Sequence, residues 1–485
     1  MNNKNNNKKD VLLIIVIVLV VLHCIAAFLF FMFCFPYKGS NLFKKKTETK
    51  PYDYELSQEE ALRDFDFAYN QLKRIHPAMH DKTSSEFQTI TAAYSNERNI
   101  ILTKEKVSVV NLTQSIERIF SILGDAHTFA RITYDNPLYL KYVPQKIYDG
   151  FEFKAVNGIS YEDLLQQKKE FYSFESEEWA MNKLTDDSVS IHGLAYLGFS
   201  TDSATYVFEK TIEEVDENNV THPKKLLDFF IATKDDYVPY SEYVKIVQDV
   251  KSAKAANDQK QNQEQNQEVQ KQSAQDSLPF CYYKIDEEHN LAVLTLTSCI
   301  NDSFYNNCLK QMFTEIKQKN IKNVAVDVRK NSGGSSLVIN NFFKYLDIPS
   351  YYESTGSSRF GPFILKANNG YTKNRKHKKL LFDGNVFVLT STLSFSSAMM
   401  FPQYVKDNGI GKVIGETPAN NPNGYGDIVS FNLPYSKIFM QISFKQFHRI
   451  NQNTSEKYVE PDYPCDSNKV FEVLYELIDS NAEIK

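Results

Sequence analysis

The chain has 485 residues, 42% of them hydrophobic, and a formal net charge of −5 at pH 7. This length is enough for about two or three packed units, each with its own apolar core. Because the charge is mildly negative and no basic stripe with interleaved aromatic residues is present, the sequence argues against a nucleic-acid-binding protein.

An uncharged apolar run at residues 11–35 follows a short polar tail at 1–10. A run of about 25 apolar residues can span a hydrocarbon core of about 30 Å. The apolar part of a cleaved signal peptide usually has only about 7–15 residues and ends at small side chains. Here the run ends in bulky residues: Phe33, Cys34, Phe35 and Pro36. The sequence therefore predicts one uncleaved transmembrane helix over 11–35.

The charges that flank this segment leave its orientation open. Three lysines precede the run and five follow it, namely Lys4, Lys8 and Lys9, then Lys38, Lys44, Lys45, Lys46 and Lys50. Counted alone, they favour a cytoplasmic location for the rest of the chain, but large domains can be translocated against such a bias.

A juxtamembrane segment at 36–54 leads to the first periodic pattern of the chain. Residues 57–75 carry apolar side chains at helical spacing, and Ser57 is followed three positions later by Glu60. This arrangement predicts a helix that begins with a capping box. Further helices are predicted at about 84–95 and 106–123. We therefore expect a helical N-terminal cap unit over 55–135, followed by a mixed α/β middle region over 136–250.

Residues 251–278 are rich in Gln, Asn, Lys and Glu and contain almost no apolar side chains. Such a segment cannot bury a core, so we predict a flexible linker or an extended loop. Beyond it, from 279 to 480, the pattern alternates: a strand at 291–299, a helix at 303–319 and a strand at 323–328. This alternation predicts an α/β unit with parallel strands and right-handed crossovers.

The six cysteines do not form a metal-binding pattern. Two of them lie in the apolar run, and the other four are Cys281, Cys299, Cys308 and Cys465. These four could form two disulfides in three possible pairings or remain reduced, and we favour buried thiols. No Cys or His spacing suggests zinc, so we expect no metal.

Two segments of the α/β unit carry the residues of a candidate catalytic site. The buried strand near 323–328 ends in Asn331–Gly334, where residues without side chains let backbone N–H groups approach a ligand oxygen. A second strand, Val386–Leu389, leads through a Ser/Thr-rich turn to a helix start at Ser396 and Ser397. A hydroxyl at such a helix start suits a nucleophile, provided that a base and oxyanion donors are present. The alternative interpretation is a Ser-rich turn that only caps the helix.

Three sequences in this order, DVRKNSGG (327–334), TLSFSSAMMF (392–401) and VIGET (413–417), resemble a known family of serine peptidases. It contains the C-terminal-processing (tail-specific) and tricorn-core peptidases, and the resemblance covers most of the chain beyond the first fifty residues. The resemblance implies a crotonase/ClpP-like α/β peptidase core over 279–480 beneath the helical cap. It also implies a peptide or unfolded protein segment as substrate and no metal or organic cofactor.

The resemblance implies Ser396 as the nucleophile, although Met399 stands where the family usually has Glu. The tail-specific members use a lysine base at the position that Asn421 occupies here, so a Ser–Lys dyad looks excluded. Tricorn-like members use Ser, His and Glu, and the sequence ILGDAHTFARI (122–132) offers His127 as the base. Histidine suits this task because its unperturbed pKa lies near neutrality. The alternative is a capping or core histidine.

The remaining groups of the site are also placed by the resemblance. The third member of the triad is expected just before a Pro-Asp pair, where Glu456 is preferred over Glu460. The oxyanion donors would be the backbone N–H of Gly333 or Gly334 together with that of Ser397. His76, in a His-Pro pair, is expected to support the helical cap.

Relatives of this kind are usually extracytoplasmic, so we place the peptidase domain outside the cytoplasm, tethered to the membrane by the N-terminal helix. The alternative is a catalytically inactive relative that keeps the peptidase fold as a binding protein, as photoreceptor retinoid-binding proteins do. A structural surface protein whose globular part presents the linker is a further alternative. The sequence predicts no particular oligomeric state.

Overall fold

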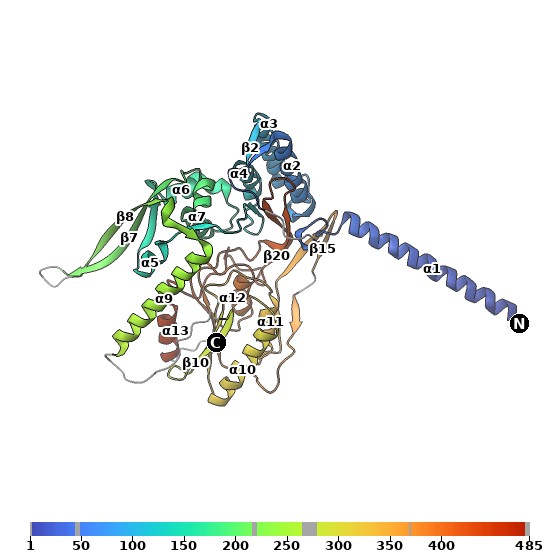
Figure 1. The fold of residues 1–485 in the computed structure, drawn as a ribbon. Helices are drawn as coiled ribbons and strands as arrows, with labels where there is room; N and C mark the ends of the chain where they lie inside the picture. Colours follow the sequence, from blue (N-terminus) through green and yellow to red (C-terminus); the bar gives the residue numbers. More distant parts are fainter. Residues whose placement is uncertain (1, 44–48, 216–220, 264–278, 368–369, 481–485) are drawn as a thin grey trace.

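The computed structural model describes residues 2–43, 49–215, 221–263, 279–367 and 370–480. A long helix, α1 (Asn2–Phe33), extends away from a body built of helices and sheets (Figure 1). Within α1, Leu12–Met32 is long and apolar enough to cross a membrane, with a mean hydropathy of 3.3 and none of this stretch buried.

The helical cap consists of α2 (Gln58–Ile75), α3 (Ser85–Leu102) and α4 (Val109–Phe120). The predicted capping box is confirmed: the Glu60 carboxylate accepts the backbone N–H of Ser57 at 2.9 Å, and the Ser57 hydroxyl oxygen accepts the N–H of Glu60. The apolar faces of these helices pack against one face of β19 (Tyr425–Asn432) and β20 (Phe439–His448), so the cap shares its core with strands from the C-terminal part of the chain.

The middle region forms a separate apolar cluster around a four-stranded antiparallel sheet in the order β6-β5-β7-β8. Its strands are β5 (Glu152–Val156), β6 (Ile159–Ser160), β7 (Ser203–Val215) and β8 (Thr221–Thr233). The helices that pack on it are α6 (Tyr161–Lys168), α7 (Glu177–Ser188) and α8 (Ile191–Leu197).

Part of the segment expected to be a flexible linker is helical. Helix α9 (Tyr240–Gln263) continues through residues 251–263, and residues 264–278 lie outside the described residues. Lys, Gln, Glu and Ala are good helix formers, so a helix can continue here without burying an apolar face. Low apolar content had indicated the absence of a core, and it does not by itself exclude a helix.

The C-terminal unit is built on a six-stranded sheet in the order β10-β11-β12-β17-β18-β21, parallel from β11 onward. Its strands are β10 (Cys281–Asp286), β11 (Leu291–Leu296), β12 (Asn323–Asp327), β17 (Asn385–Thr390), β18 (Lys412–Gly415) and β21 (Tyr463–Pro464). This arrangement confirms the predicted α/β pattern with parallel strands. The six cysteines of the chain are all free thiols.

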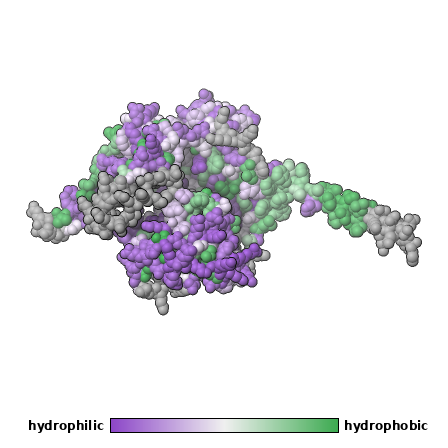
Figure 2. Space-filling view, turned by 60° about the horizontal axis from the view of Figure 1, so that its bottom comes forward, coloured by the Kyte–Doolittle hydropathy of each residue, from purple (hydrophilic) through white to green (hydrophobic). Residues whose placement is uncertain are grey.

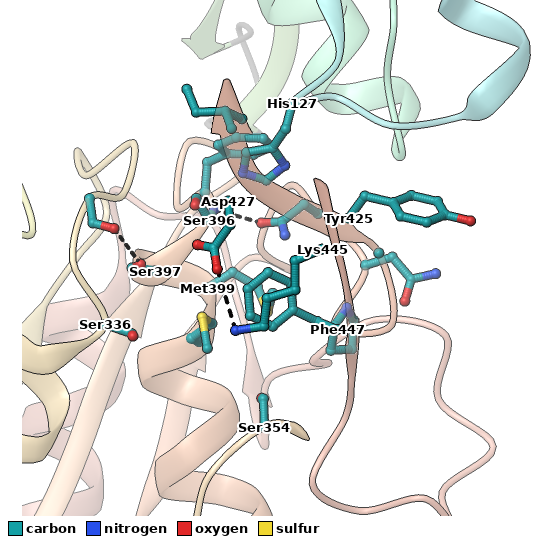
Figure 3. A pocket seen from close by; sticks show the side chains of 18 of the residues that line it. His127, Ser336, Ser354, Ser396, Ser397, Met399, Tyr425, Asp427, Lys445 and Phe447 are labelled. Atoms are coloured by element: carbon teal, nitrogen blue, oxygen red, sulfur yellow. Dashed lines mark hydrogen bonds and ion pairs between the residues drawn. The ribbon is translucent and has the colours of Figure 1, made fainter. Parts of the chain in front are cut away.

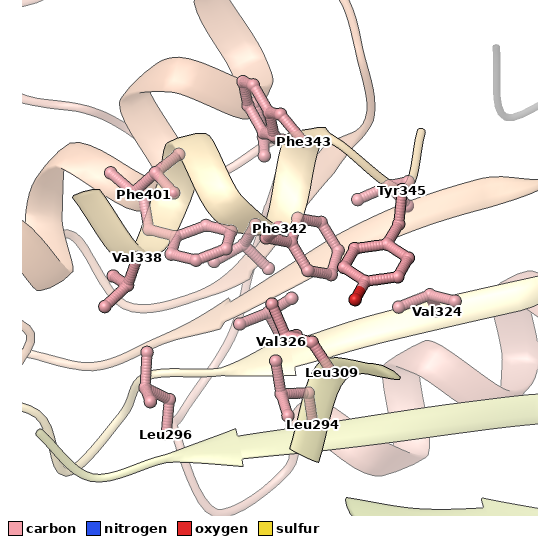
Figure 4. Packing of buried hydrophobic residues seen from close by; sticks show 14 of the residues in the cluster. Leu294, Leu296, Leu309, Val324, Val326, Val338, Phe342, Phe343, Tyr345 and Phe401 are labelled. Carbon is pink, nitrogen blue, oxygen red and sulfur yellow. The ribbon is translucent and has the colours of Figure 1, made fainter. Parts of the chain in front are cut away.

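Helices cover both faces of this sheet. On one face, Val324 and Val326 of β12 pack against α10 (Ser303–Lys319), α11 (Leu337–Phe343) and α12 (Ser397–Asp407), as Figure 4 shows for part of this cluster. On the other face, Ala325 packs with Val470 and Leu474 of α13 (Val470–Asp479). Every residue of β12 is buried in consequence, which is the usual state of a central parallel strand.

A second sheet joins the cap to the C-terminal unit. Its order is β15-β14-β20-β19, with β3 (Phe129–Arg131) paired to the beginning of β20. Strand β15 (Phe363–Lys366) is at one edge of this sheet, and β14 (Thr355–Phe360) lies between β15 and β20. The remaining short elements are β1 (Glu55–Ser57), β2 (Lys106–Ser108), β4 (Leu138–Leu140), α5 (Val143–Tyr148), β9 (Tyr237–Pro239), β13 (Ser350–Tyr352) and β16 (Tyr371–Lys373).

Candidate active site

Ser396 occupies a sharp turn between strand β17 and helix α12. Its φ of 56° and ψ of −124° are rare for a residue with a side chain, and it is the residue directly before α12. Its backbone N–H donates to Oδ1 of Asn420 at 2.8 Å. A serine held in a strained strand-to-helix turn has the backbone geometry of a nucleophile elbow.

Gly333 packs directly against this serine. A Cβ atom at position 333 would lie 2.6 Å from Cβ of Ser396, and the φ of Gly333 is 103°. Both observations require glycine here. The turn at the end of β12 is therefore in direct contact with the turn that carries Ser396.

The neighbouring serine hydroxyls are occupied by hydrogen bonds to backbone carbonyls. Ser391 donates to Arg329 O at 2.5 Å, Ser394 to Val328 O at 2.9 Å and Ser397 to Gly334 O at 2.8 Å. Over the described part of the chain, no hydrogen bond is recorded for the Ser396 hydroxyl. The Ser-rich turn is thus structural at three positions, whereas the Ser396 hydroxyl is left available to a ligand.

Of the three expected oxyanion donors, the Gly333 N–H is already used. It donates to Oδ1 of the buried Asn331 at 2.8 Å, because Asn side chains readily bond the backbone two residues ahead. Within the described ranges, the N–H groups of Gly334 and Ser397 have no recorded acceptor. The Ser397 hydroxyl bond to Gly334 O holds these two backbone segments together.

His127 lines the same cavity of about 490 Å³ as Ser396, and both lie at the end away from Ser354 (Figure 3). It precedes β3, whose pairing with β20 carries it to the C-terminal unit, and its backbone carbonyl accepts Nε2–H of Gln441 at 2.8 Å. The ring packs on Phe395 with centroids 4.5 Å apart. Neither ring nitrogen has a hydrogen-bond partner among the described residues, so the imidazole is free to act on a ligand.

A buried network lies behind His127. The backbone N–H of Ala78 donates to Nδ1 of His76, so Nε2 of that ring carries the proton and donates to Oδ2 of Asp125 at 3.2 Å. Asp125 also accepts the backbone N–H of His127 at 2.9 Å. Burial opposes ionisation of Asp125, but hydrogen bonds from the two histidines hold its pKa well below the ordinary value. His76 thus caps the turn after α2 as expected, and it also orients Asp125.

Glu456, expected as the third member of a triad, lies elsewhere. Its carboxylate is paired with Lys406 at 2.8 Å and with Arg449 at 2.9 Å. Lys406 is in the last turn of α12, about 15 Å along the helix from Ser396. The alternative, Glu460, contacts the same lysine through its backbone carbonyl. Two cations therefore hold Glu456, and among the described residues no contact between Glu456 and His127 is observed.

Glu175 is the carboxylate that the structure places beside His127 together with Asp125. Its Oε1 is 3.9 Å from Nδ1 of His127, its Oε2 accepts the N–H of Asn421 at 2.6 Å, and its side chain is only 3% exposed. Burial, followed by the charge of Asp125, raises the pKa of Glu175 well above the ordinary value. By donor type and spacing, Asp125, His127 and Glu175 could also hold a metal ion.

The position expected to bear a lysine in tail-specific relatives has a structural role here. Oδ1 of Asn421 accepts the N–H of Asn423 at 2.8 Å, which stabilises a turn. The cavity does contain a lysine from another element: Lys445 of β20, whose Nζ is 3.4 Å from Asp427. The sequence offered no signal for Lys445 or Glu175, because neither lies in a motif and both arrive through long-range packing.

A second cavity of about 610 Å³ adjoins the first, and Ser332, Phe395 and Gln441 line both. It is rich in aromatic side chains, including Trp179, whose ring stacks on Phe395 at 4.2 Å. Cavities of this size hold small ligands or several side chains. The two together offer room on both sides of a peptide bond placed at Ser396.

Comparisons with known proteins agree with this geometry. Residues 290–465 match the model of peptidase family S41. The crystal structure of mature CPAF is similar over 88% of this chain and 99% of its own, with 12% identity and a TM-score of 0.55. Mature CPAF complexed with lactacystin is similar over 87% of this chain and 97% of its own, with 13% identity and a TM-score of 0.53. The photosystem II D1 C-terminal processing protease is similar over 87% of this chain and 98% of its own, with 12% identity and a TM-score of 0.46. A search of curated protein sequences finds no match.

At identities of 12–13%, the likeness to CPAF shows a shared fold, and the family rests on the sequence match. That match contains the Gly333–Gly334 turn, the Ser396 turn and the strands that hold them. Residues 290–465 thus match peptidase family S41, and this match supports a serine-type peptidase in a chain of mixed helices and sheets.

Proposed function

We propose that this chain is a membrane-anchored serine endopeptidase that hydrolyses peptides or unfolded protein segments with Ser396 as nucleophile and His127 as base. The observation that carries the proposal is the pairing of these two groups in one cavity. A serine hydroxyl without a hydrogen-bond partner in a strained turn faces the same space as an imidazole with two nitrogens unpartnered among the described residues. This combination belongs to the tricorn-like, histidine-based branch of the chemistry.

The proposed reaction uses groups already in place. Nε2 of His127 takes the proton of Ser396 Oγ as Oγ attacks the carbonyl carbon of the substrate. The resulting oxyanion accepts hydrogen bonds from the N–H groups of Gly334 and Ser397. The imidazolium then gives its proton to the leaving amine. In the second half, the imidazole takes a proton from water as the water attacks the acyl-enzyme, and it returns this proton to Ser396 Oγ as the acid product leaves.

We further propose that Glu175, rather than Glu456, is the carboxylate that orients the imidazole. Formation of the imidazolium brings a positive charge within 3.9 Å of a carboxyl whose ionisation is opposed by burial and by Asp125. This charge offsets part of the cost of ionising Glu175, so the pair is strengthened in the transition state.

The rest of the proposal concerns the arrangement of the chain. The transmembrane anchor at 11–35 would hold a helical cap at 55–135, a middle region at 136–250 and a crotonase/ClpP-like peptidase core at 279–480 outside the cytoplasm. Support for the anchor is the apolar helix Leu12–Met32, and support for the outside location is the usual compartment of the relatives that the sequence resembles.

Substitution of the proposed nucleophile tests both the site and the inactive-binding-protein alternative. Ser396→Ala should lower casein hydrolysis by more than about a thousandfold while the thermal unfolding temperature stays the same, because the lost hydroxyl leaves no sizeable cavity. A fluorophosphonate probe should label the wild-type protein at Ser396. Failure of the wild-type protein to react would favour a binding protein, and a label on Ser394 or Ser397 would identify a different nucleophile.

The proposed base is tested by comparing three substitutions. His127→Ala should abolish activity, and wild-type activity should fall as the pH is lowered, because a protonated imidazole cannot accept the serine proton. Asn421→Ala should change kcat/KM much less. An active His127→Ala enzyme combined with an inactive Lys445→Met enzyme would contradict the histidine mechanism and indicate a Ser–Lys dyad.

Glu175→Gln and Glu456→Gln form a matched pair that separates orientation from stability. Glu175→Gln should lower kcat by about 10²–10⁴-fold, as expected when an imidazole loses its orienting carboxylate. Glu456→Gln should leave kcat nearly unchanged and lower the free energy of unfolding by about 1–3 kcal/mol in urea titrations, because the buried Arg449 loses a charged partner. The opposite assignment of the two effects would restore Glu456 to the triad.

The proposed topology is tested with protease added to intact cells. The Gln-rich segment 251–277 has almost no apolar side chains, so it should be cut first and give a membrane-bound piece of about 255 residues and a C-terminal piece with Ser396. Complete protection of intact cells, with cleavage only after lysis, would place the domain in the cytoplasm.

A further inference from the structure

Helix α1 joins the body of the protein without an intervening linker. Cys34 and Pro36, at the end of this helix, are buried. Arg74, in the last turn of α2, donates to the backbone carbonyls of Phe35 at 3.1 Å and Pro36 at 3.0 Å. These contacts fix the direction in which α1 leaves the body.

Aromatic side chains reinforce this joint. The ring of Phe30, inside the apolar stretch Leu12–Met32, lies 6.0 Å from the ring of Phe360 in β14. Phe360 in turn contacts Phe444 of β20 at 6.2 Å, and Tyr37 contacts Phe444 at 5.8 Å. The end of β14 is therefore level with residues of α1 that belong to its apolar stretch.

The register of the β14–β15 hairpin places two more apolar side chains, Phe363 and Leu365, on the same face as Phe360. Phe360 is paired with Phe363, and Ser358 with Leu365. Directly opposite residues of antiparallel strands point to the same face, and so do residues two positions apart. Phe363 and Leu365 therefore lie on the face through which Phe360 meets α1, yet they are 56% and 57% exposed.

The turn that carries these residues is braced from the cap. The carbonyl of Pro362 accepts a hydrogen bond from Nε2 of His80 at 3.0 Å, and Gly361 adopts a φ of 60° that allows the tight reversal. Figure 2 shows the apolar surface of α1 running up to the body of the molecule. A single exposed apolar residue needs no explanation, but a braced pair directed along a membrane-crossing helix does.

We infer that the β14–β15 hairpin, residues 360–365, inserts Phe363 and Leu365 into the interface of the phospholipid bilayer that α1 crosses. This inference rests on the proposed membrane anchor. It adds that the peptidase domain is docked on the lipid surface in one orientation and does not hang from a flexible tether.

The test uses the full-length chain in phosphatidylcholine vesicles whose acyl chains carry bromine, which quenches tryptophan emission on contact. Phe363→Trp adds a reporter at the hairpin, and Phe229→Trp is the matched control. Phe229 is 65% exposed on β8, which projects from the opposite side of the body from α1 (Figure 1). The native Trp179 is buried and gives the same background in both proteins. The Phe363→Trp protein should lose most of its added emission in brominated vesicles, and the Phe229→Trp protein should lose none.

A third reporter separates docking from anchoring. Leu22→Trp places a tryptophan within α1, and its emission should be quenched if this helix is in the bilayer. Quenching of Leu22→Trp without quenching of Phe363→Trp would overturn the docking of the hairpin and leave the membrane anchor supported. Absence of quenching for both reporters would overturn both the anchor and the docking. Equal quenching of the hairpin reporter and the β8 control would also overturn the docking. If Phe363→Trp disturbs the hairpin, Leu365→Trp on the same face should report the same loss of emission.

Discussion

The alternation of side chains along β20 is the constraint on which both the cap and the candidate active site depend. One set lines the cavity that contains Ser396 and His127: Gln441, Lys445 and Phe447. The intervening set packs into the core of the helical cap: Met440, Ile442 and Phe444. A shift of one residue in register would exchange the two sets and remove the Gln441 bond to the carbonyl of His127, a partner 314 positions away in the sequence. The apolar pattern of a C-terminal strand thus fixes the place of an N-terminal histidine.

Behind that histidine, the electrostatics favour a positive charge. Asp125 is fully buried between His76 and His127 and has a lowered pKa, whereas burial, followed by the charge of Asp125, raises the pKa of the nearby Glu175. Two carboxyl groups therefore lie beside an imidazole whose ring nitrogens have no hydrogen-bond partner among the described residues. A proton arriving on His127 during acyl transfer would place a positive charge beside both groups and would favour the ionisation of Glu175. Groups that are preorganised for the charge of a transition state, and not of the resting state, are the usual source of catalytic stabilisation.

Local patterns in the sequence predicted a large part of this structure. The capping box at Ser57, the parallel α/β pattern and the turn at Ser396 all rest on spacing within a short segment, so they could be inferred without tertiary contacts. Glu175 could not be found in this way, because it approaches His127 only through the packing of the middle region. Glu456 was placed by its distance from a Pro-Asp pair, and nothing in that spacing revealed that Lys406 and Arg449 would hold it. The helix through 251–263 was missed because the low apolar content of this segment was taken to indicate a loop, whereas the helix propensity of its residues determines whether a helix forms.

The contacts that hold α1 to the body also set the distance between the end of this helix and the cavity that contains Ser396. Phe444 takes part in these contacts, and Phe447, three positions further along β20, lines this cavity. At about 3.3 Å per residue, the two lie about 10 Å apart along the strand. With the proposed anchor in a bilayer and Ser396 as the proposed nucleophile, Ser396 would stay at a nearly constant height above the lipids. Such an enzyme would select the site of cleavage in a neighbouring membrane protein by the distance of the scissile bond from the membrane surface.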